Sequence, residues 1–186
     1  MKKILLIFVL VLSISKINAQ SPFESQIKLT YDEGITNDKD NSFGAEFLCG
    51  IRMNNKLRLG VGVGISYCDL LYEKAGLNNL LNKYYGEYRE SSVYVPVFAN
   101  IKYNFINSKV SPYIAAVLGY PIFIASSSYT KNNNLGLFFK PCFGVDFPVK
   151  NEKLFLEVGY KYQQRSWSRL ESPDYMQASI AIGCQF

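Results

Sequence analysis

Residues 176–186, the last eleven of the chain, constrain its fold more than any other stretch. Apolar side chains alternate there with polar or small ones, and the chain ends on an aromatic residue. The apolar positions are Met176, Ala178, Ile180, Ile182, Cys184 and Phe186. A period of two indicates an extended strand with one apolar face. The length suits a tilted strand across a bilayer, which needs about 9–11 residues, although a soluble strand would bury the same face in a core.

The first 19 residues have the pattern of an export signal. Two lysines precede an apolar run at residues 4–14, and Ile-Asn-Ala at residues 17–19 has the form of a cleavage site. A membrane anchor is the alternative, but about 11 apolar residues fall short of the ~20 that a spanning helix needs. We predict a cleaved signal peptide at residues 1–19 and one domain at residues 20–186. That domain has no second long apolar run, so a membrane crossing would use strands.

The amino-acid composition agrees with strands that have one face toward lipid and the other toward a polar lumen. Aromatic residues make up 15% of the chain. Mean hydropathy is +0.00 because apolar and polar residues alternate, as in a barrel with a lipid-facing outside and a polar lumen. Three of the 20 Lys and Arg residues lie in the leader, which leaves 17 against 15 acidic residues. This near balance gives no basic footprint for nucleic acid, so we predict no nucleic-acid partner.

Seven further segments with a period of two precede the C-terminal one. The clearest lies at residues 57–68, where aliphatic residues alternate with a face rich in glycine, and the weakest lies at residues 112–124. The remaining five lie at residues 26–31, 44–53, 93–103, 136–147 and 154–163. Together with the C-terminal segment they make eight predicted strands.

The connections between these strands alternate in length. They are short after the second, fourth and sixth strands, at residues 54–56, 106–109 and 150–153. They are longer after the first, third, fifth and seventh, at residues 32–42, 69–90, 126–134 and 165–174. A barrel inserted from the periplasm has short inner turns and longer outer loops, whereas a β-sandwich has no reason to alternate. We predict an all-β fold, an eight-stranded antiparallel up-and-down transmembrane β-barrel.

The order and spacing of these features resemble a small OmpA/OmpX-type barrel of the outer-membrane β-barrel (porin) families. The resemblance covers residues 23–186 and is carried by the leader, the glycine-interleaved strand 57–67, Pro112-Tyr113, residues 158–162, and an ending similar to the C-terminal insertion signal, with Ile180, Ile182 and Phe186. It implies the bacterial outer membrane as location, a monomer, and two partners, outer-membrane lipid and the barrel-assembly machinery. Members serve as wall anchors, adhesion or resistance proteins, or narrow channels. No peptidoglycan-binding domain follows Phe186, so we do not expect a wall anchor.

The chain contains no histidine, which excludes His-based triads and His-containing metal sites. It also argues against the barrel proteases and lipid acyltransferases of the outer membrane, which depend on a histidine. Glycines at 60, 62 and 64 are not followed by a helix, so they indicate relief of crowding in a narrow barrel, not a phosphate loop. We predict no enzyme activity, no catalytic residue, no cofactor and no metal site.

Four cysteines in an exported chain raise the question of disulfides. The strand pattern places Cys49 and Cys184 toward lipid, and Cys68 and Cys142 toward the lumen. Neither pair lies on neighbouring strands. A Cys68–Cys142 bridge across the lumen stays open as an alternative, since a disulfide requires a Cα separation under ~7 Å.

Charged residues on the lumen-facing side form the most informative polar cluster. They are Lys28, Glu46, Arg52, Arg58, Lys102, Lys140, Asp146, Glu157 and Lys161. An eight-stranded barrel is only wide enough for its side chains to fill, and unpaired buried charge is costly. We expect Arg52, Arg58 and Lys102 to approach Asp146 and Glu157 near the periplasmic end, and Glu46 to lie near Lys140 or Lys161. A salt-bridged plug is the leading interpretation, and a narrow anion-preferring channel is the alternative.

Aromatic residues lie near both predicted ends of the strands. The inner group is Tyr103, Phe105, Phe147 and Phe186, and the outer group is Tyr31, Tyr67, Tyr162 and Trp167. Interfacial girdles of a membrane barrel have this arrangement. A carbohydrate-binding aromatic cluster is the alternative.

The connection at residues 69–90 is the candidate interaction loop. Within it Leu77, Leu80, Leu81, Tyr84, Tyr85 and Tyr88 recur at helical spacing, which predicts a short amphipathic turn over the barrel mouth or at the lipid surface. Loops on rigid scaffolds often carry binding function, so an extracellular ligand or a host surface is a candidate partner. The alternative is a loop that only caps the barrel.

Three function classes follow from these observations. The leading one is an integral outer-membrane barrel with a largely filled lumen and a structural or surface-interaction role through its extracellular loops. The second is a narrow, anion-preferring diffusion channel. The third is an exported soluble lipocalin-like binder, which would need an apolar lumen that the predicted interior charges do not provide.

Overall fold

The computed structural model describes residues 23–35, 41–75, 85–106, 108–126, 134–150, 152–166 and 175–186. The predicted signal peptide lies outside these ranges. The described residues form eight strands: β1 (Phe23–Gly34), β2 (Asn41–Arg52), β3 (Leu57–Ala75), β4 (Tyr85–Asn104), β5 (Ser111–Ser126), β6 (Asn134–Val149), β7 (Glu152–Ser166) and β8 (Tyr175–Gln185). All eight predicted strands are confirmed.

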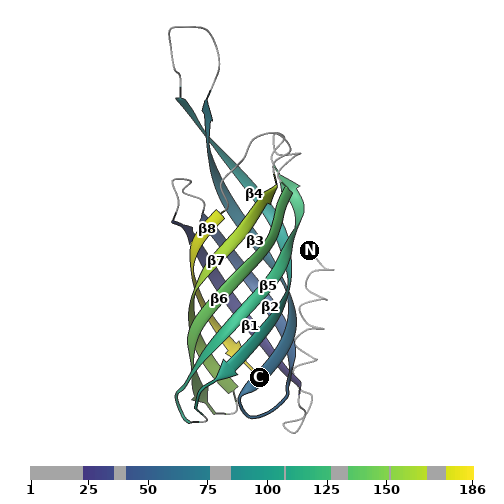
Figure 1. Ribbon diagram of the computed structural model, residues 1–186, viewed down its shortest axis with the longest axis vertical. Helices are drawn as coiled ribbons and strands as arrows, with labels where there is room; N and C mark the ends of the chain where they lie inside the picture. The colour runs from purple at the N-terminus through teal and green to yellow at the C-terminus, as the bar shows by residue number, and fades with distance from the viewer. Residues whose placement is uncertain are drawn as a thin grey trace.

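The strands close into one antiparallel barrel in which each pairs with its neighbour in the sequence and β1 pairs with β8 (Figure 1). In the closing seam Leu29 lies opposite Ile182. Beyond it, Ser25 and Phe186 exchange two backbone hydrogen bonds of 3.0 Å. The C-terminal segment therefore completes the wall, and no strand edge is left along this seam.

The two ends of the barrel differ as the connection lengths predict. The turn end carries the short β2–β3, β4–β5 and β6–β7 connections together with the C-terminus (Figure 1). The side chain of Asn54 accepts hydrogen bonds from the backbone N–H groups of Lys56 and Leu57, at 2.8 and 2.7 Å, which stabilises the first of these turns. Lys150 turns the chain after β6 with a φ of 57°. The opposite, loop end carries the longer connections.

The loop end differs from the prediction in one region. β3 and β4 extend the connection predicted at residues 69–90 into a paired hairpin that reaches Ala75 and Tyr85. β2 ends its pairing with β3 at Asp69, and β5 ends its pairing with β4 at Ser92. Residues 70–75 and 85–90, here called the β3–β4 arm, thus form a two-stranded ribbon beyond the other strands, about 20 Å long at the usual rise per residue.

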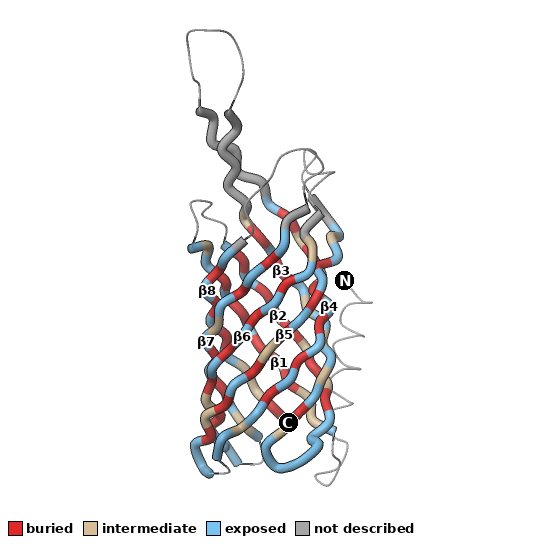
Figure 2. Tube along the Cα trace, viewed as in Figure 1, coloured by how far each residue is buried: buried red, intermediate tan, exposed pale blue. Residues whose placement is uncertain are grey.

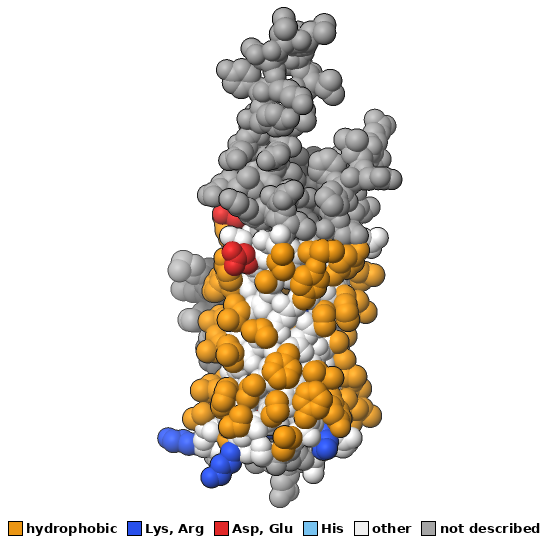
Figure 3. Space-filling model, turned by 60° about the vertical axis from the view of Figure 1, so that its left-hand side comes forward, with side chains coloured by type: hydrophobic (Ala, Val, Ile, Leu, Met, Phe, Trp, Pro, Cys, Tyr) orange, Lys and Arg blue, Asp and Glu red, His pale blue; other side chains and the backbone are white. Residues whose placement is uncertain are grey.

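Side chains alternate strictly between the two faces of the wall, as the tube in Figure 2 shows by its regular change from buried to exposed. Along β5, Tyr113, Ala115 and Val117 are buried, whereas Ile114 and Leu118 are exposed. The exposed face is apolar over the barrel wall, with acidic residues above and basic residues below in the view of Figure 3. A water-soluble protein places its apolar side chains inside, so this polarity is inverted as in a membrane barrel.

Aromatic residues follow the two predicted bands. Near the turn end Tyr103 and Phe105 stack edge to face with ring centroids 5.9 Å apart, and both are exposed on the outer surface. Phe147 there, and Tyr31, Tyr67 and Tyr162 nearer the loop end, are likewise exposed outward. Trp167 lies outside the described residues. As far as the chain is described, no helix has the length and apolar character to span a membrane.

Candidate functional site in the barrel lumen

The period of two brings the predicted lumen charges to the inside of the barrel. Eight of the nine are buried: Lys28, Glu46, Arg58, Lys102, Lys140, Asp146, Glu157 and Lys161. Arg52 is the exception, because it ends β2 at the rim of the turn end, where its side chain is 43% exposed. The sequence therefore predicts correctly which charged residues are buried in the lumen, with the exception of Arg52 at the rim.

The middle of the lumen holds a cation shared by two carboxylates. Lys28 Nζ lies 2.9 Å from Glu46 Oε2 and 3.7 Å from Glu157 Oε1. The Tyr113 hydroxyl donates a hydrogen bond of 3.2 Å to Glu157, and Lys28 Nζ also lies 5.6 Å from the ring centre of Phe98. Three groups from β1, β2 and β7 thus meet inside the barrel, where one lysine is shared by two carboxylates.

A second ion pair lies toward the loop end. Lys161 Nζ is 3.1 Å from Asp32 Oδ2 and donates a hydrogen bond of 3.2 Å to the Tyr94 hydroxyl. Ser42 donates to the same carboxylate oxygen at 3.1 Å. The ring centre of Phe138 lies 5.5 Å from Lys161 Nζ. This layer spans β1, β2, β4, β6 and β7.

A third ion pair lies toward the turn end. Lys102 Nζ is 2.7 Å from Asp146 Oδ1, and Asn104 Nδ2 donates to Asp146 Oδ2 at 2.9 Å. Lys102 Nζ also lies 3.8 Å from the ring centre of Tyr113, a cation–π contact. The buried carboxylate is therefore satisfied from two sides, and the lysine is held over an aromatic face.

Aromatic rings fill the space between the ion pairs, each directly across from a glycine. Four cross-strand pairs share this arrangement: Gly62 with Phe98, Gly119 with Phe138, Gly144 with Tyr113, and Gly183 with Phe155. A Cβ atom added at any of these glycines would lie 2.3–2.4 Å from the ring opposite. Glycine is required because the ring occupies the space that a Cβ atom would need. For Gly62 this confirms the predicted relief of crowding inside the barrel. A Cβ atom at Gly60 or Gly64 would likewise lie 2.9 Å from the side chain of Leu48 or Glu46, respectively.

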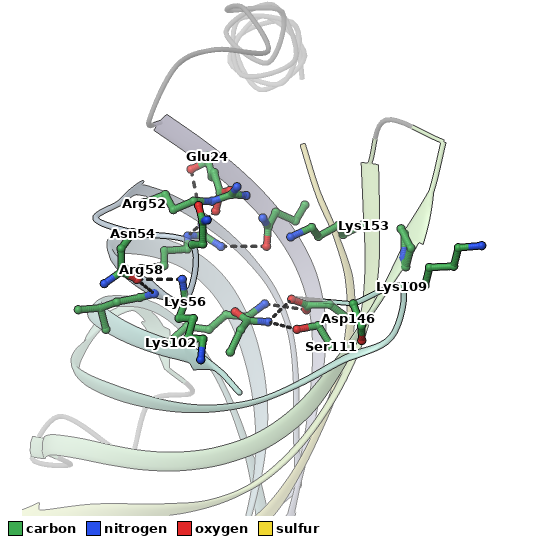
Figure 4. A pocket seen from close by; sticks show the side chains of 16 residues that line it. Glu24, Arg52, Asn54, Lys56, Arg58, Lys102, Lys109, Ser111, Asp146 and Lys153 are labelled. Atoms are coloured by element: carbon green, nitrogen blue, oxygen red, sulfur yellow. Dashed lines mark hydrogen bonds and ion pairs between the residues drawn. The ribbon is translucent and has the colours of Figure 1, made fainter. Parts of the chain in front are cut away.

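At the turn end the lumen contains a cavity with a volume of ≈ 350 Å³ (Figure 4). Arg52 forms an ion pair with Glu24 at its rim. Arg58 lies deeper, with its Nε 3.6 Å from Glu24 Oε2. The Lys102–Asp146 pair also lines the cavity, and Tyr113, in contact with Lys102, is fully buried above it.

The predicted approach of Arg52, Arg58 and Lys102 to Asp146 is found, since all four residues line one cavity, but only Lys102 forms an ion pair with Asp146. Arg52 and Arg58 instead pair with Glu24, because β1 begins at Phe23 and brings this earlier carboxylate to the rim.

Glu46 was expected near Lys140 or Lys161 but pairs with Lys28. Lys28 and Glu46 are direct partners in the β1–β2 register, so the short cross-strand distance decides the pairing. Lys140 is buried. Among the described residues, no carboxylate forms an ion pair with it.

Sequence reasoning missed two carboxylates and the aromatic packing. Glu24 and Asp32 have the same parity as Lys28 on β1, so extending the first predicted strand by two residues at its start and one at its end would have found both. The four aromatic residues also alternate onto the lumen face of their strands, but the glycines that they pack against lie on neighbouring strands. Which ring lies opposite which glycine depends on the register between the strands, and the sequence does not show this register.

The four cysteines lie on the faces predicted for them. Cys68 and Cys142 are buried in the lumen, and Cys49 and Cys184 are partly exposed in the outer wall. None of the four is joined in a disulfide, and the alternative of a Cys68–Cys142 bridge is not realised in this structure.

The candidate loop residues are only partly described. Tyr85 and Tyr88 lie in β4, where a strand replaces the predicted helical turn. Leu77, Leu80, Leu81 and Tyr84 lie outside the described residues. In the C-terminal signal, Ile180 and Ile182 are exposed on the outer face of β8 and Phe186 is partly exposed. Their role in insertion stays a prediction.

Chemically, the lumen is a set of buried ion pairs separated by aromatic rings. Within the described ranges no three Cys, Asp or Glu side chains cluster as a metal site would require. The rings of Phe98, Phe138, Tyr113 and Phe155 between these ion pairs are all buried. That the chain is not an enzyme stays a prediction.

A closed eight-stranded up-and-down barrel with an apolar outside and a polar, packed inside is a barrel of the OmpA/OmpX type. Comparison of the sequence with protein-family models and with curated proteins finds no match.

Solved structures of outer-membrane barrels do match. The chain is similar to Neisserial surface protein A (NspA), with 18% identity, coverage of 89% of this chain and 96% of NspA, and a TM-score of 0.53. It is similar to the outer membrane protein OprG from Pseudomonas aeruginosa, with 12% identity, coverage of 89% and 96%, and a TM-score of 0.50. The outer membrane enzyme PagL also matches, with 16% identity, coverage of 87% and 98%, and a TM-score of 0.45. At these identities the likeness shows the fold alone.

Proposed function

We propose that the protein is an integral barrel of the bacterial outer membrane with a closed lumen, and that it acts at the cell surface through the β3–β4 arm. The observation that carries the proposal is the packing of the lumen. The Lys28, Lys102 and Lys161 ion pairs alternate with aromatic rings between the loop end and the cavity at the turn end. A role that requires passage of solutes is disfavoured by this packing.

The outer-membrane location is supported by the inverted polarity of the wall. Apolar side chains such as Val61, Ile65 and Leu118 are 54–67% exposed, whereas charged ones are buried. Short turns at one end and long connections at the other agree with insertion from the periplasm. On this basis the turn end faces the periplasm and the loop end faces the outside.

A surface role is supported by the length of the arm. β3 and β4 have 19 and 20 residues, against 11 to 16 in the other strands. The extra residues contribute nothing to closing the barrel, because β2 and β5 have already ended. Ribbons and loops on a rigid scaffold are common carriers of recognition.

The arm can be removed without disturbing the barrel register. Leu70 and Glu90 at the base of the arm are direct backbone partners, so an Asn-Gly turn in place of residues 71–89 joins them in a two-residue hairpin. We expect cells with this variant to insert a normal barrel and to lose binding to the host cells or matrix proteins that the full chain binds.

The matched control replaces residues 127–133, the connection after β5, by a turn. Cells with this control variant should keep the binding. If the armless barrel is inserted normally and keeps every binding phenotype of the full chain, the surface role of the arm is wrong.

A further inference from the structure

The cavity at the turn end has a strong excess of positive charge. Its lining contains six cationic residues, Arg52, Lys56, Arg58, Lys102, Lys109 and Lys153, and two carboxylates, Glu24 and Asp146. Asp146 is held by Lys102 and Asn104, and Glu24 is held by Arg52 and Arg58. Within the described ranges, no ion pair includes Lys56, Lys109 or Lys153. Low-dielectric walls focus such a field into the cavity.

Arg58 lines this cavity and lacks close partners for a buried guanidinium. It is 3% exposed. Its Nε makes no hydrogen bond to a described residue, and its two other nitrogens make long ones, 3.4 Å to Gln185 Oε1 and 3.5 Å to the Glu24 carbonyl. Charge-assisted hydrogen bonds are usually about 2.7–2.9 Å long, so Arg58 has donor capacity left for a further acceptor.

The cavity has room for such an acceptor. At about 30 Å³ per water molecule, ≈ 350 Å³ holds an anion the size of phosphate together with several waters. Lys153 points from β7 toward the centre of the cavity, across from Arg52 and Arg58 (Figure 4). Cations from β2, β3 and β7 thus surround one polar space that is open at the turn end.

We propose that this cavity is a blind binding site for a phosphate-class anion, held by Arg58 and Lys153 with Arg52 and Lys56 at the rim. The Lys102–Asp146 pair and the ring of Tyr113 close its floor, so the anion binds and does not pass through. The site is at the opposite end from the β3–β4 arm and does not depend on a surface role. A free phosphate compound and the headgroup of an anionic phospholipid offer the same chemistry.

The test is a calorimetric titration of the refolded mature barrel with pyrophosphate, in a detergent without phosphate and at low salt. Lys153→Gln and Arg58→Gln should each weaken binding by roughly tenfold, the effect of one lost charge-assisted contact. Lys153 is only partly buried, so we expect the Lys153→Gln variant to fold. It therefore still tests the site if the Arg58→Gln variant fails to fold. Lys150→Gln is the matched control, because it removes an exposed charge at the same end that does not line the cavity.

Two results overturn the proposal. One is the absence of pyrophosphate binding to the wild-type barrel, and the other is an equal loss of affinity in the Lys150 and Lys153 variants, which would mean only nonspecific attraction. The source of the phosphate is decided by repeating the titration in nanodiscs of phosphatidylcholine with and without phosphatidylglycerol. Binding that phosphatidylglycerol suppresses identifies a lipid headgroup as the occupant, and binding that it leaves unchanged identifies a soluble phosphate compound.

Discussion

Single glycines decide how closely the lumen can pack. Gly119 lies opposite Phe138, and a Cβ atom there would be 2.4 Å from the ring. We expect Gly119→Val to lower the free energy of unfolding by about 1–3 kcal/mol, the usual cost of overpacking. Urea titration of the refolded barrel in lipid vesicles measures this change.

The second half of this test is a rescue. Adding Phe138→Ala to Gly119→Val should recover part of the lost stability, because the ring that clashes is gone. If the two changes are simply additive, the glycine and the ring do not pack against each other.

Lys28 is the cation that two buried carboxylates share. Lys28→Met leaves Glu46 and Glu157 without their shared cation, and removal of one partner from a buried pair typically costs about 3–5 kcal/mol. We expect the urea midpoint of this variant to fall strongly. Lys150→Met, an exposed lysine at the turn end, should change it little. Similar midpoints for both variants would contradict the buried ion pair.

At the scale of single residues, the sequence predicts which side chains face the lumen but not which of them are in contact. A period of two is a local property, so Lys28, Glu46 and Lys161 could be assigned to one face without a structure. Partners across the lumen depend on the stagger of eight strands. The expected contact of Glu46 with Lys140 or Lys161 was wrong for this reason, since Lys28 is its neighbour in the register.

At the scale of elements, each strand presents one apolar face outward, which we propose lies in lipid. Leu118 and Ile124 both point outward from β5 and are 54% and 65% exposed, but Leu118 lies nearer mid-wall, where it pairs with Ala99 and Phe139. Arginine on a lipid-facing position costs about 2–4 kcal/mol at the bilayer midplane and about 0–1 kcal/mol near the interface.

We therefore expect Leu118→Arg to destabilise the barrel in vesicles by about 2–4 kcal/mol and Ile124→Arg by about 0–1 kcal/mol. The measurement is the free energy of unfolding of both variants beside the wild type. Equal, small effects would indicate that this face is in water and not in lipid.

Strand number, order and the contrast between the two ends were predictable from the sequence, because each strand alternates and each turn is short or long. The β3–β4 arm was not. Its residues combine leucine and tyrosine at a spacing that also suits a helix, and the pairing of residues 70–75 with 85–90 joins segments that alternate too weakly to be recognised.

At the scale of the whole molecule, barrel closure and lumen packing act together. Eight strands enclose a space that side chains can fill, and here ion pairs and rings fill it from Asp32 near the loop end to Asp146 near the turn end. The outer wall is thereby suited to lipid, and the packing of the lumen is the basis of our proposal that the barrel is closed to solutes. The cavity at the turn end is a recess in this packing and not a passage.

The most direct test of the closed lumen is single-channel recording. The mature barrel is refolded in detergent, confirmed as folded by its heat-dependent shift on a gel, and inserted into a planar bilayer beside a known porin as positive control. We predict that inserted wild-type barrels stay silent under an applied voltage. A steady conductance with anion preference, reduced by Lys102→Gln or Lys161→Gln, would contradict the closed lumen and establish the channel interpretation instead.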